Sequence, residues 1–290
     1  MLFFRRLLTV LDMIKFHHTV FALPFALLAM VWAAGGWPRW TVFLGVLLAM
    51  VGARSAAMTF NRIADRKYDV LNPRTSKWPL SSGAVSLPFA WGFFLVSVAV
   101  FFGAAWWLNP LCLALSPLAL AVILGYSYSK RFTALCHLIL GFADGISAPG
   151  AWIAVTGTLA GSAPAWWLCA ALTAWIGGFD YLYSLQDREF DRDQGLHSWP
   201  ARFGVASTLW VSGALHAVTV VFLALAGHGV GAGWLFWAAL GATAMALLYE
   251  HLIVRPSDLS RINAAFFTVN GYISIGLFLT GVGDLWLRSR

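Results

Sequence analysis

Apolar stretches of about 20 residues recur along the whole chain, and short polar segments separate them. A helix of that length crosses the roughly 30 Å hydrocarbon core of a bilayer, and within lipid a helix satisfies its own backbone hydrogen bonds. The pattern therefore predicts an all-α, polytopic membrane protein with one domain over residues 1–290. The nine expected spans are 16–36, 40–60, 85–107, 111–128, 135–156, 165–186, 205–227, 232–252 and 262–283, with kinks or breaks at Pro24, Pro117 and Pro149.

The charges are few and unevenly placed. Only 11% of the residues are charged, whereas a soluble domain has about 25%. The net charge of +7 does not indicate a nucleic-acid partner, because 15 of the 19 Lys and Arg residues precede the first span or follow an even-numbered one, and only 3 lie in the other loops and the C-terminal tail. The positive-inside rule then places the N-terminus and the basic loops in the cytoplasm, and the odd number of spans places the C-terminus outside.

Two acidic motifs carry the chemistry. Each reads DxxxD at the end of a long apolar run, with Asp65 and Asp69 in the first copy and Asp187 and Asp191 in the second. Carboxylates four positions apart project from one face of a helix. Their oxygens suit Mg²⁺ that is shared with phosphate oxygens. One DxxxD motif is usually a pair of solvated loop charges, but two copies at matched positions, each beside basic residues, favour a functional site at the membrane edge.

Neighbouring residues extend this site. Asn61 adds an amide oxygen one turn before Asp65, and Arg54, two turns further inward, could meet the carboxylate of an aromatic substrate. Asp180 either extends the second acidic face or pairs with a basic group such as Arg54. The candidates for neutralising the remaining phosphate charge are Lys67, Arg74, Lys130 and Arg131. The histidines are weaker candidates, because a histidine near a span more often serves packing; these are His17, His18 and His137.

At these positions the chain resembles the UbiA superfamily of intramembrane aromatic prenyltransferases. The family pattern is NxxxDxxxD after the second helix and a YxxxDxxxD-like motif after the sixth, and it is matched by Asn61, Asp65, Asp69, Tyr183, Asp187 and Asp191. Two further segments match, Asn72-Pro73-Arg74-Thr75 and Lys130-Arg131-Phe132-Thr133, while Lys77 departs from the pattern. The resemblance implies nine helices around a central cavity, with Mg²⁺ and diphosphate under a cytoplasmic cap and Tyr183 at the donor site.

The resemblance implies Mg²⁺-dependent transfer of a polyprenyl group from polyprenyl diphosphate to an aromatic acid, in contact with membrane lipid and on the cytoplasmic side of the bacterial inner membrane. Within the superfamily, the segment from Lys15 to Pro24 looks most like enzymes of the futalosine route, which implies a dihydroxynaphthoate acceptor and menaquinone biosynthesis. The alternative is a 4-hydroxybenzoate polyprenyltransferase of ubiquinone biosynthesis. A cation-coupled transporter is the alternative of another class, but its acids are expected near the midplane and not at the membrane edge. A non-catalytic scaffold leaves the duplicated acids unexplained.

Overall fold

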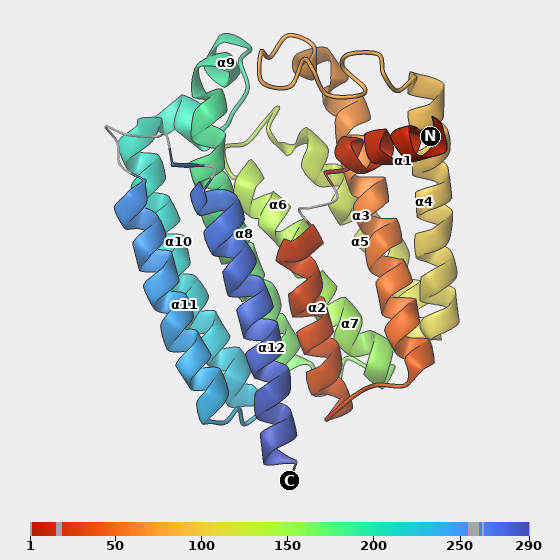
Figure 1. The fold of residues 1–290 in the computed structure, drawn as a ribbon, viewed down its shortest axis with the longest axis vertical. Coiled ribbons are helices and arrows are strands. Elements are labelled where there is room, and N and C mark those ends of the chain that lie inside the picture. The colour runs from red at the N-terminus through yellow and green to blue at the C-terminus, as the bar shows by residue number, and fades with distance from the viewer. Residues whose placement is uncertain (1, 16–18, 255–260, 263, 290) are drawn as a thin grey trace. The chain divides into compact units, whose positions relative to one another are not determined.

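The computed structural model describes residues 2–15, 19–254, 261–262 and 264–289 (Figure 1). His17 and His18 lie outside the described residues. Within these ranges the chain forms helices and no strand. The prediction of an all-helical membrane fold is confirmed by these helices and by their apolar character.

The helices follow one another along the chain. They are α1 (Leu2–Met13), α2 (Thr19–Ala34), α3 (Trp40–Asp69), α4 (Leu87–Leu108), α5 (Pro110–Ser129), α6 (Cys136–Gly145), α7 (Ser147–Thr156), α8 (Ala163–Ser184), α9 (Arg188–Asp193), α10 (Trp199–Gly229), α11 (Trp234–Ile253) and α12 (Asn270–Arg288). A 3-10 helix, η2 (Leu185–Asp187), joins α8 to α9, and a π-helix, η3 (Ala264–Val269), precedes α12.

Six segments of the described chain are long and apolar enough to cross a membrane: α3, α4, α5, α6 with α7, α10 and α11. With α2, α8 and α12 they occupy the nine predicted positions. The predicted span over 135–156 consists of two helices. Helix α6 ends before Ile146 and α7 begins after it, so Pro149 lies in the first turn of α7. Proline is tolerated there, since the first-turn N–H groups have no partner within the helix. By contrast, α2 and α5 run through Pro24 and Pro117 without a break.

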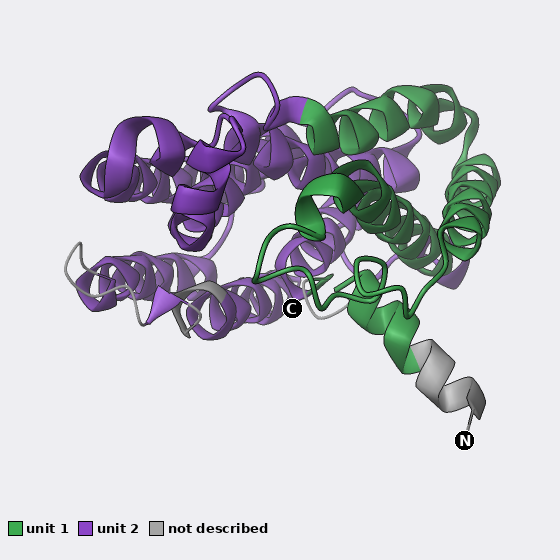
Figure 2. Cartoon of the chain, turned by 90° about the horizontal axis from the view of Figure 1, so that it is seen from above, with its two compact units in different colours: residues 1–19, 44–128 green, residues 20–43, 129–290 purple. Residues whose placement is uncertain are grey.

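The chain forms two compact units, which Figure 2 colours separately. Unit 1 comprises residues 1–19 and 44–128, and unit 2 comprises residues 20–43 and 129–290. The single domain expected from the sequence stays a prediction. In unit 1, Leu80 lies in the same buried cluster as Met13 and Met58. The loop after α3 is therefore fixed by the hydrophobic core of its own unit.

In unit 2, α6 packs along α8 through glycines one turn apart. A Cβ atom on Gly141 would collide with the backbone oxygen of Thr173, and one on Gly145 would lie 2.7 Å from the backbone oxygen of Cys169. The two backbones are in direct contact here, as is typical of small residues between membrane helices. This close approach sets which side chains of α6 can reach α8.

Polar side chains also connect the buried helices of unit 2. The ring of His216 on α10 occupies the space where a side chain on Gly178 of α8 would lie. His216 Nδ1 is 2.9 Å from Nε2 of His251 on α11. Trp175 Nε1 donates to Asn270 Oδ1 at 2.7 Å. Specific contacts of this kind between buried polar side chains favour a single arrangement of the helices.

Candidate active site

The first acidic motif lies on the last turns of α3, which continues as one helix of 30 residues through both aspartates. The amide of Asn61 donates from Nδ2 to Oδ2 of Asp65 at 3.1 Å. Asp65 is half-buried and Asp69 is 8% exposed. Asn61 and Asp65 therefore share one helix face, as their spacing predicts.

A cation holds the second carboxylate of this motif. Arg62 Nη1 lies 3.4 Å from Asp69 Oδ2, and the Arg62 guanidinium stacks 3.9 Å from the ring centroid of Trp78. Arg74 and Lys15 lie 5.4 and 5.1 Å from the same ring. Aromatic faces attract cations at such distances. Trp78 thus gathers three cations beside the first motif.

Sequence reasoning missed Arg62 and Trp78. Arg62 precedes Asp69 by seven residues, which is two helical turns, so the spacing could have identified it. No sequence signal identified Trp78, since its position depends on how the loop after α3 folds back.

Hydrogen bonds shape that loop. The backbone N–H of Arg74 donates to Asn72 Oδ1 at 2.9 Å, which is an Asx turn. Thr75 Oγ1 donates to the backbone oxygen of Asp69 at 2.9 Å. These contacts hold the half-buried Arg74 in the same unit as the first motif. Lys67, in contrast, is exposed and lies 4.6 Å from the ring centroid of Tyr68, so its role at phosphate stays a prediction.

Arg54 lies on α3 seven residues before Asn61 and is half-buried. That separation is about 10 Å along the helix. An arginine at this depth of a membrane helix is rare and by default a functional candidate. Its contact with an acceptor stays a prediction.

The second acidic motif spans a break in the helix. Tyr183 lies in the last turn of α8, Asp187 ends the 3-10 segment, and Asp191 lies in α9. The ring of Tyr183 packs 6.3 Å from that of Phe267. Asp187 and Asp191 are 7% and 0% exposed. The sequence predicted one regular helix face here, whereas the structure carries the two carboxylates on two short helical segments.

Lys130 is the cation beside the second motif. Its Nζ lies 2.8 Å from Oδ1 of Asp191, and its backbone oxygen accepts the N–H of His197 at 2.7 Å. Burial alone would lower the pKa of the Lys130 ammonium, but the carboxylates of Asp191 and Asp187 outweigh it and raise that pKa above its usual value. Lys130 is thus charged at neutral pH. Arg131, next in sequence, is half-buried.

The donor atoms suit a divalent cation that is shared with a substrate. In the described part of the chain, no group of three or more His, Cys, Asp or Glu side chains is arranged to hold a metal ion. Each DxxxD motif supplies two carboxylates, and Mg²⁺ is usually held by one or two carboxylates together with substrate phosphates and water. The residues therefore fit Mg²⁺ bound with a phosphorylated ligand, and not an all-protein cage.

A buried histidine pairs with Asp180. His137 Nδ1 on α6 lies 2.7 Å from Oδ2 of Asp180 on α8. The sequence suggested either an extended acidic face or a pair with Arg54, and it assigned His137 to packing. The described structure instead gives Asp180 a histidine partner, two turns before Asp187. The close α6–α8 contact places the two side chains within reach.

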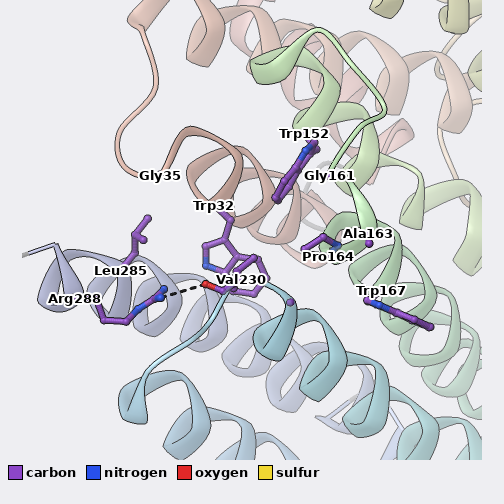
Figure 3. A pocket seen from close by; sticks show the side chains of 11 residues that line it. Trp32, Gly35, Trp152, Gly161, Ala163, Pro164, Trp167, Val230, Leu285 and Arg288 are labelled. Atoms are coloured by element: carbon purple, nitrogen blue, oxygen red, sulfur yellow. Dashed lines mark hydrogen bonds between the residues drawn. The ribbon is translucent and has the colours of Figure 1, made fainter.

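Unit 2 also holds a pocket of about 510 Å³ near the start of α8 (Figure 3). Its wall includes Trp32, Trp152, Trp167 and Arg288. Arg288 Nη1 donates to the backbone oxygen of Val230 at 3.2 Å. The pocket and Asp187 lie at opposite ends of the 22-residue α8, which is about 33 Å long. It is therefore separate from the second acidic motif.

Comparison with known proteins gives the family. The sequence profile described as the UbiA prenyltransferase family matches residues 22–272. The chain belongs to the UbiA prenyltransferase family. Its expected class, a prenyltransferase enzyme, is thereby confirmed.

Individual relatives agree with this UbiA assignment. The chain is 34% identical over 256 residues to the 4-hydroxybenzoate octaprenyltransferase of Vibrio atlanticus, covering 87% of this chain and 89% of that protein. It is 36% identical over 260 residues to the protein of the same name from Xanthomonas campestris, and the match covers 88% of this chain and 84% of that protein. An apo structure of a UbiA homolog from Aeropyrum pernix is similar with a TM-score of 0.81 and 32% identity, covering 94% of this chain and 98% of that one.

A UbiA homolog from Archaeoglobus fulgidus, solved with DMAPP and Mg²⁺ bound, shares the fold with a TM-score of 0.73 and 20% identity. The alignment covers 96% of this chain and 99% of that chain. At this identity the similarity concerns the fold alone. The UbiA family fold therefore extends over nearly the whole length of the chain.

Proposed function

We propose that this UbiA family member transfers a polyprenyl group from its diphosphate to a ring carbon of a carboxylated phenol. The observation that carries the proposal is the pair of DxxxD motifs, each held beside a cation: Asp69 beside Arg62, and Asp191 beside Lys130. Carboxylates together with nearby cations suit the binding of a metal diphosphate.

In this proposal the acidic residues and Asn61 hold Mg²⁺, and the basic residues bind phosphate oxygens. The proposed metal ligands are Asn61, Asp65, Asp69, Asp187 and Asp191. The proposed phosphate-binding residues are Lys67, Arg74, Lys130, Arg131 and Tyr183, and the structure adds Arg62 as a candidate. Bound Mg²⁺ would supply Lewis-acid neutralisation of the leaving diphosphate. The protein's own cations stabilise the same developing charge, and Arg54 orients the acceptor through its carboxylate.

The acceptor we favour is 4-hydroxybenzoate. The sequence alone favours a dihydroxynaphthoate of menaquinone biosynthesis, on the segment from Lys15 to Pro24. The relatives named above are 4-hydroxybenzoate octaprenyltransferases, and they support the alternative better. The naphthoate remains the second candidate because that N-terminal segment favours it.

The proposed location is the bacterial inner membrane, with the reaction on its cytoplasmic side. The support is the asymmetry of the basic residues, 15 against 3, and the position of both acidic motifs on the basic side. The polyprenyl tail would extend into membrane lipid.

Product formation tests this function. The purified protein is incubated with Mg²⁺, octaprenyl diphosphate and either 4-hydroxybenzoate or a dihydroxynaphthoate, and the products are identified by mass spectrometry. We expect a prenylated hydroxybenzoate that disappears when EDTA removes the metal. A product with the naphthoate alone would move the assignment to menaquinone biosynthesis. No aromatic product from either acceptor would contradict the proposed function.

A further inference from the structure

We propose that Asp180 is the base that accepts the proton lost from the acceptor ring, and that His137 positions its carboxylate. This inference rests on the proposed function, because it concerns the last step of aromatic substitution. Neither side chain belongs to the DxxxD motifs.

The geometry gives the two oxygens of Asp180 different roles. His137 Nδ1 donates to Oδ2 at 2.7 Å. Among the described residues, His137 is the hydrogen-bond partner found for the Asp180 carboxylate, and it contacts one of the two oxygens. The His137 side chain is 5% exposed and that of Asp180 is 20% exposed. One oxygen is thus fixed by the imidazole, while Oδ1 is left to accept a proton. A carboxylate whose rotamer is fixed by a second group is well positioned to act as a general base.

The position of Asp180 along α8 suits the acceptor. It precedes Asp187 by seven residues, of which the first four steps run along α8 and the last three along the 3-10 segment, so it lies about two turns before Asp187. A donor diphosphate at Asp187 and Asp191 would place its first prenyl carbon between these levels. The ring that attacks this carbon then lies within reach of Asp180. Asp187 and Asp191 remain bound to the metal and the diphosphate, so they are not needed as the base.

A purely structural role for the His137–Asp180 pair would not explain why the pair is present. The backbone contacts of Gly141 and Gly145 already hold α6 against α8, so an ion pair is not needed to join the helices. His137 Nε2 is buried and has no hydrogen-bond partner among the described residues. An unsatisfied buried nitrogen costs stability, so His137 contributes through the contact of its Nδ1 with Asp180 and not through Nε2. His137 is also too buried to touch a substrate, and we therefore assign it as a positioning residue.

The proposed step conserves atoms and electrons. The allylic C–O bond of the donor breaks, and its electron pair leaves with the diphosphate. The aromatic ring forms the new C–C bond at the allylic carbon. The C–H bond at the attacked ring carbon then breaks, its proton moves to Oδ1 of Asp180, and its electron pair restores the aromatic ring.

Asp180→Asn tests the assignment, since it keeps the shape and removes the base. We expect kcat to fall about 100-fold or more, the usual contribution of general base catalysis, with the KM values of donor and acceptor changed little. The decisive readout is the rate with a ring-deuterated acceptor. Proton loss should be fast in the unmodified enzyme and rate-limiting in the variant, so a primary isotope effect should emerge only in the variant. His137→Gln should lower kcat less, and adding it to Asp180→Asn should cause little further loss.

The matched control is Asp284→Asn, which alters an Asp284–Arg288 ion pair of 3.0 Å in the same unit, near the pocket at the far end of α8. It should keep kcat and show no isotope effect. An Asp180→Asn variant with unchanged kcat, or one that loses activity without an isotope effect, overturns the assignment. If that variant does not fold, Asp180→Glu decides: a displaced base should lower kcat and reveal the isotope effect, and normal kinetics would refute the proposal. Absence of any aromatic product from the unmodified protein would instead refute the proposed function.

Discussion

The Lys130 ammonium lies 2.8 Å from the carboxylate of Asp191, which is itself fully buried. Lys130 is therefore already paired with a residue that we assign to the metal. A cation bound by Asp191 would compete with the ammonium for the same oxygens. In the proposed reaction Lys130 would then turn from the carboxylate to a phosphate oxygen as the donor binds, so that the charge of both groups remains neutralised.

Lys130→Met should weaken both the fold and the donor site. Because it leaves a buried carboxylate unpaired, we expect a loss of about 2 kcal/mol in the free energy of unfolding. The raised pKa of Lys130 means that the pair stabilises the fold below the ordinary lysine pKa of about 10.4, and that this contribution is lost only as the pH rises through the higher pKa of the folded state. The stability difference should thus be constant from neutral pH up to that value. Thermal unfolding in detergent across this range measures it.

The exposed Lys77 provides the control for Lys130. Lys77→Met should keep both stability and donor KM, whereas Lys130→Met should raise the donor KM. Equal donor KM values in the two variants would remove Lys130 from the phosphate site.

Asp65→Asn and Asp187→Asn should each reduce turnover by orders of magnitude, because each removes a proposed ligand of the metal diphosphate. Asp193→Asn is the matched control, since its side chain is 69% exposed at the end of α9. Size-exclusion chromatography checks that all three variants are folded. Near-normal prenyl transfer by Asp65→Asn or Asp187→Asn would refute the assignment of that residue.

Arg54→Ala should impair use of the acceptor and leave the donor KM nearly unchanged. Removing the partner of a buried carboxylate costs a few kcal/mol, which corresponds to two or more decades in kcat/KM for the acceptor. An acceptor without a carboxylate serves as the control, because the variant and the unmodified enzyme should then react alike. A collapse of donor binding would instead assign Arg54 to the diphosphate.

Gly141→Ala should destabilise the protein although alanine is the better helix former. The added Cβ meets the backbone of Thr173, and overpacking of this kind costs about 1–3 kcal/mol. Gly150→Ala is the control on α7, because its Cβ would meet no atom within 4 Å. We expect the melting temperature in detergent to fall for Gly141→Ala and to stay level or rise for Gly150→Ala. A fall in both would mean that the α6–α8 contact is not specifically responsible.

The basic loops should face the cytoplasm. In a variant without native cysteines, Lys77→Cys and Gln194→Cys should be shielded from an impermeant thiol reagent in intact cells. Arg39→Cys, in the loop between α2 and α3, should be labelled. All three positions are exposed, so access from one side of the membrane decides the result. Labelling of the Lys77→Cys variant from outside would reverse the predicted topology.

Local sequence patterns were enough for much of this structure. Helix length and apolar character predicted α3, and the four-residue spacing predicted the shared face of Asn61 and Asp65. The contact of His137 with Asp180 could not be read in this way, because it joins positions 43 apart and depends on how closely two helices approach. The 3-10 segment before α9 was missed for a related reason, since no proline or glycine marks it within residues 185–187.

The close packing of His216 against Gly178 limits which substitutions these two positions can accept. Any side chain at position 178 would need the space that the imidazole fills, and the imidazole also contacts His251 on a third helix. A larger residue at position 178 is therefore compatible only with a smaller one at position 216. That second change would remove the side chain that His251 contacts on α10. Positions 178, 216 and 251 should thus covary during evolution, because a change at one of them alone would disturb the packing of the other two.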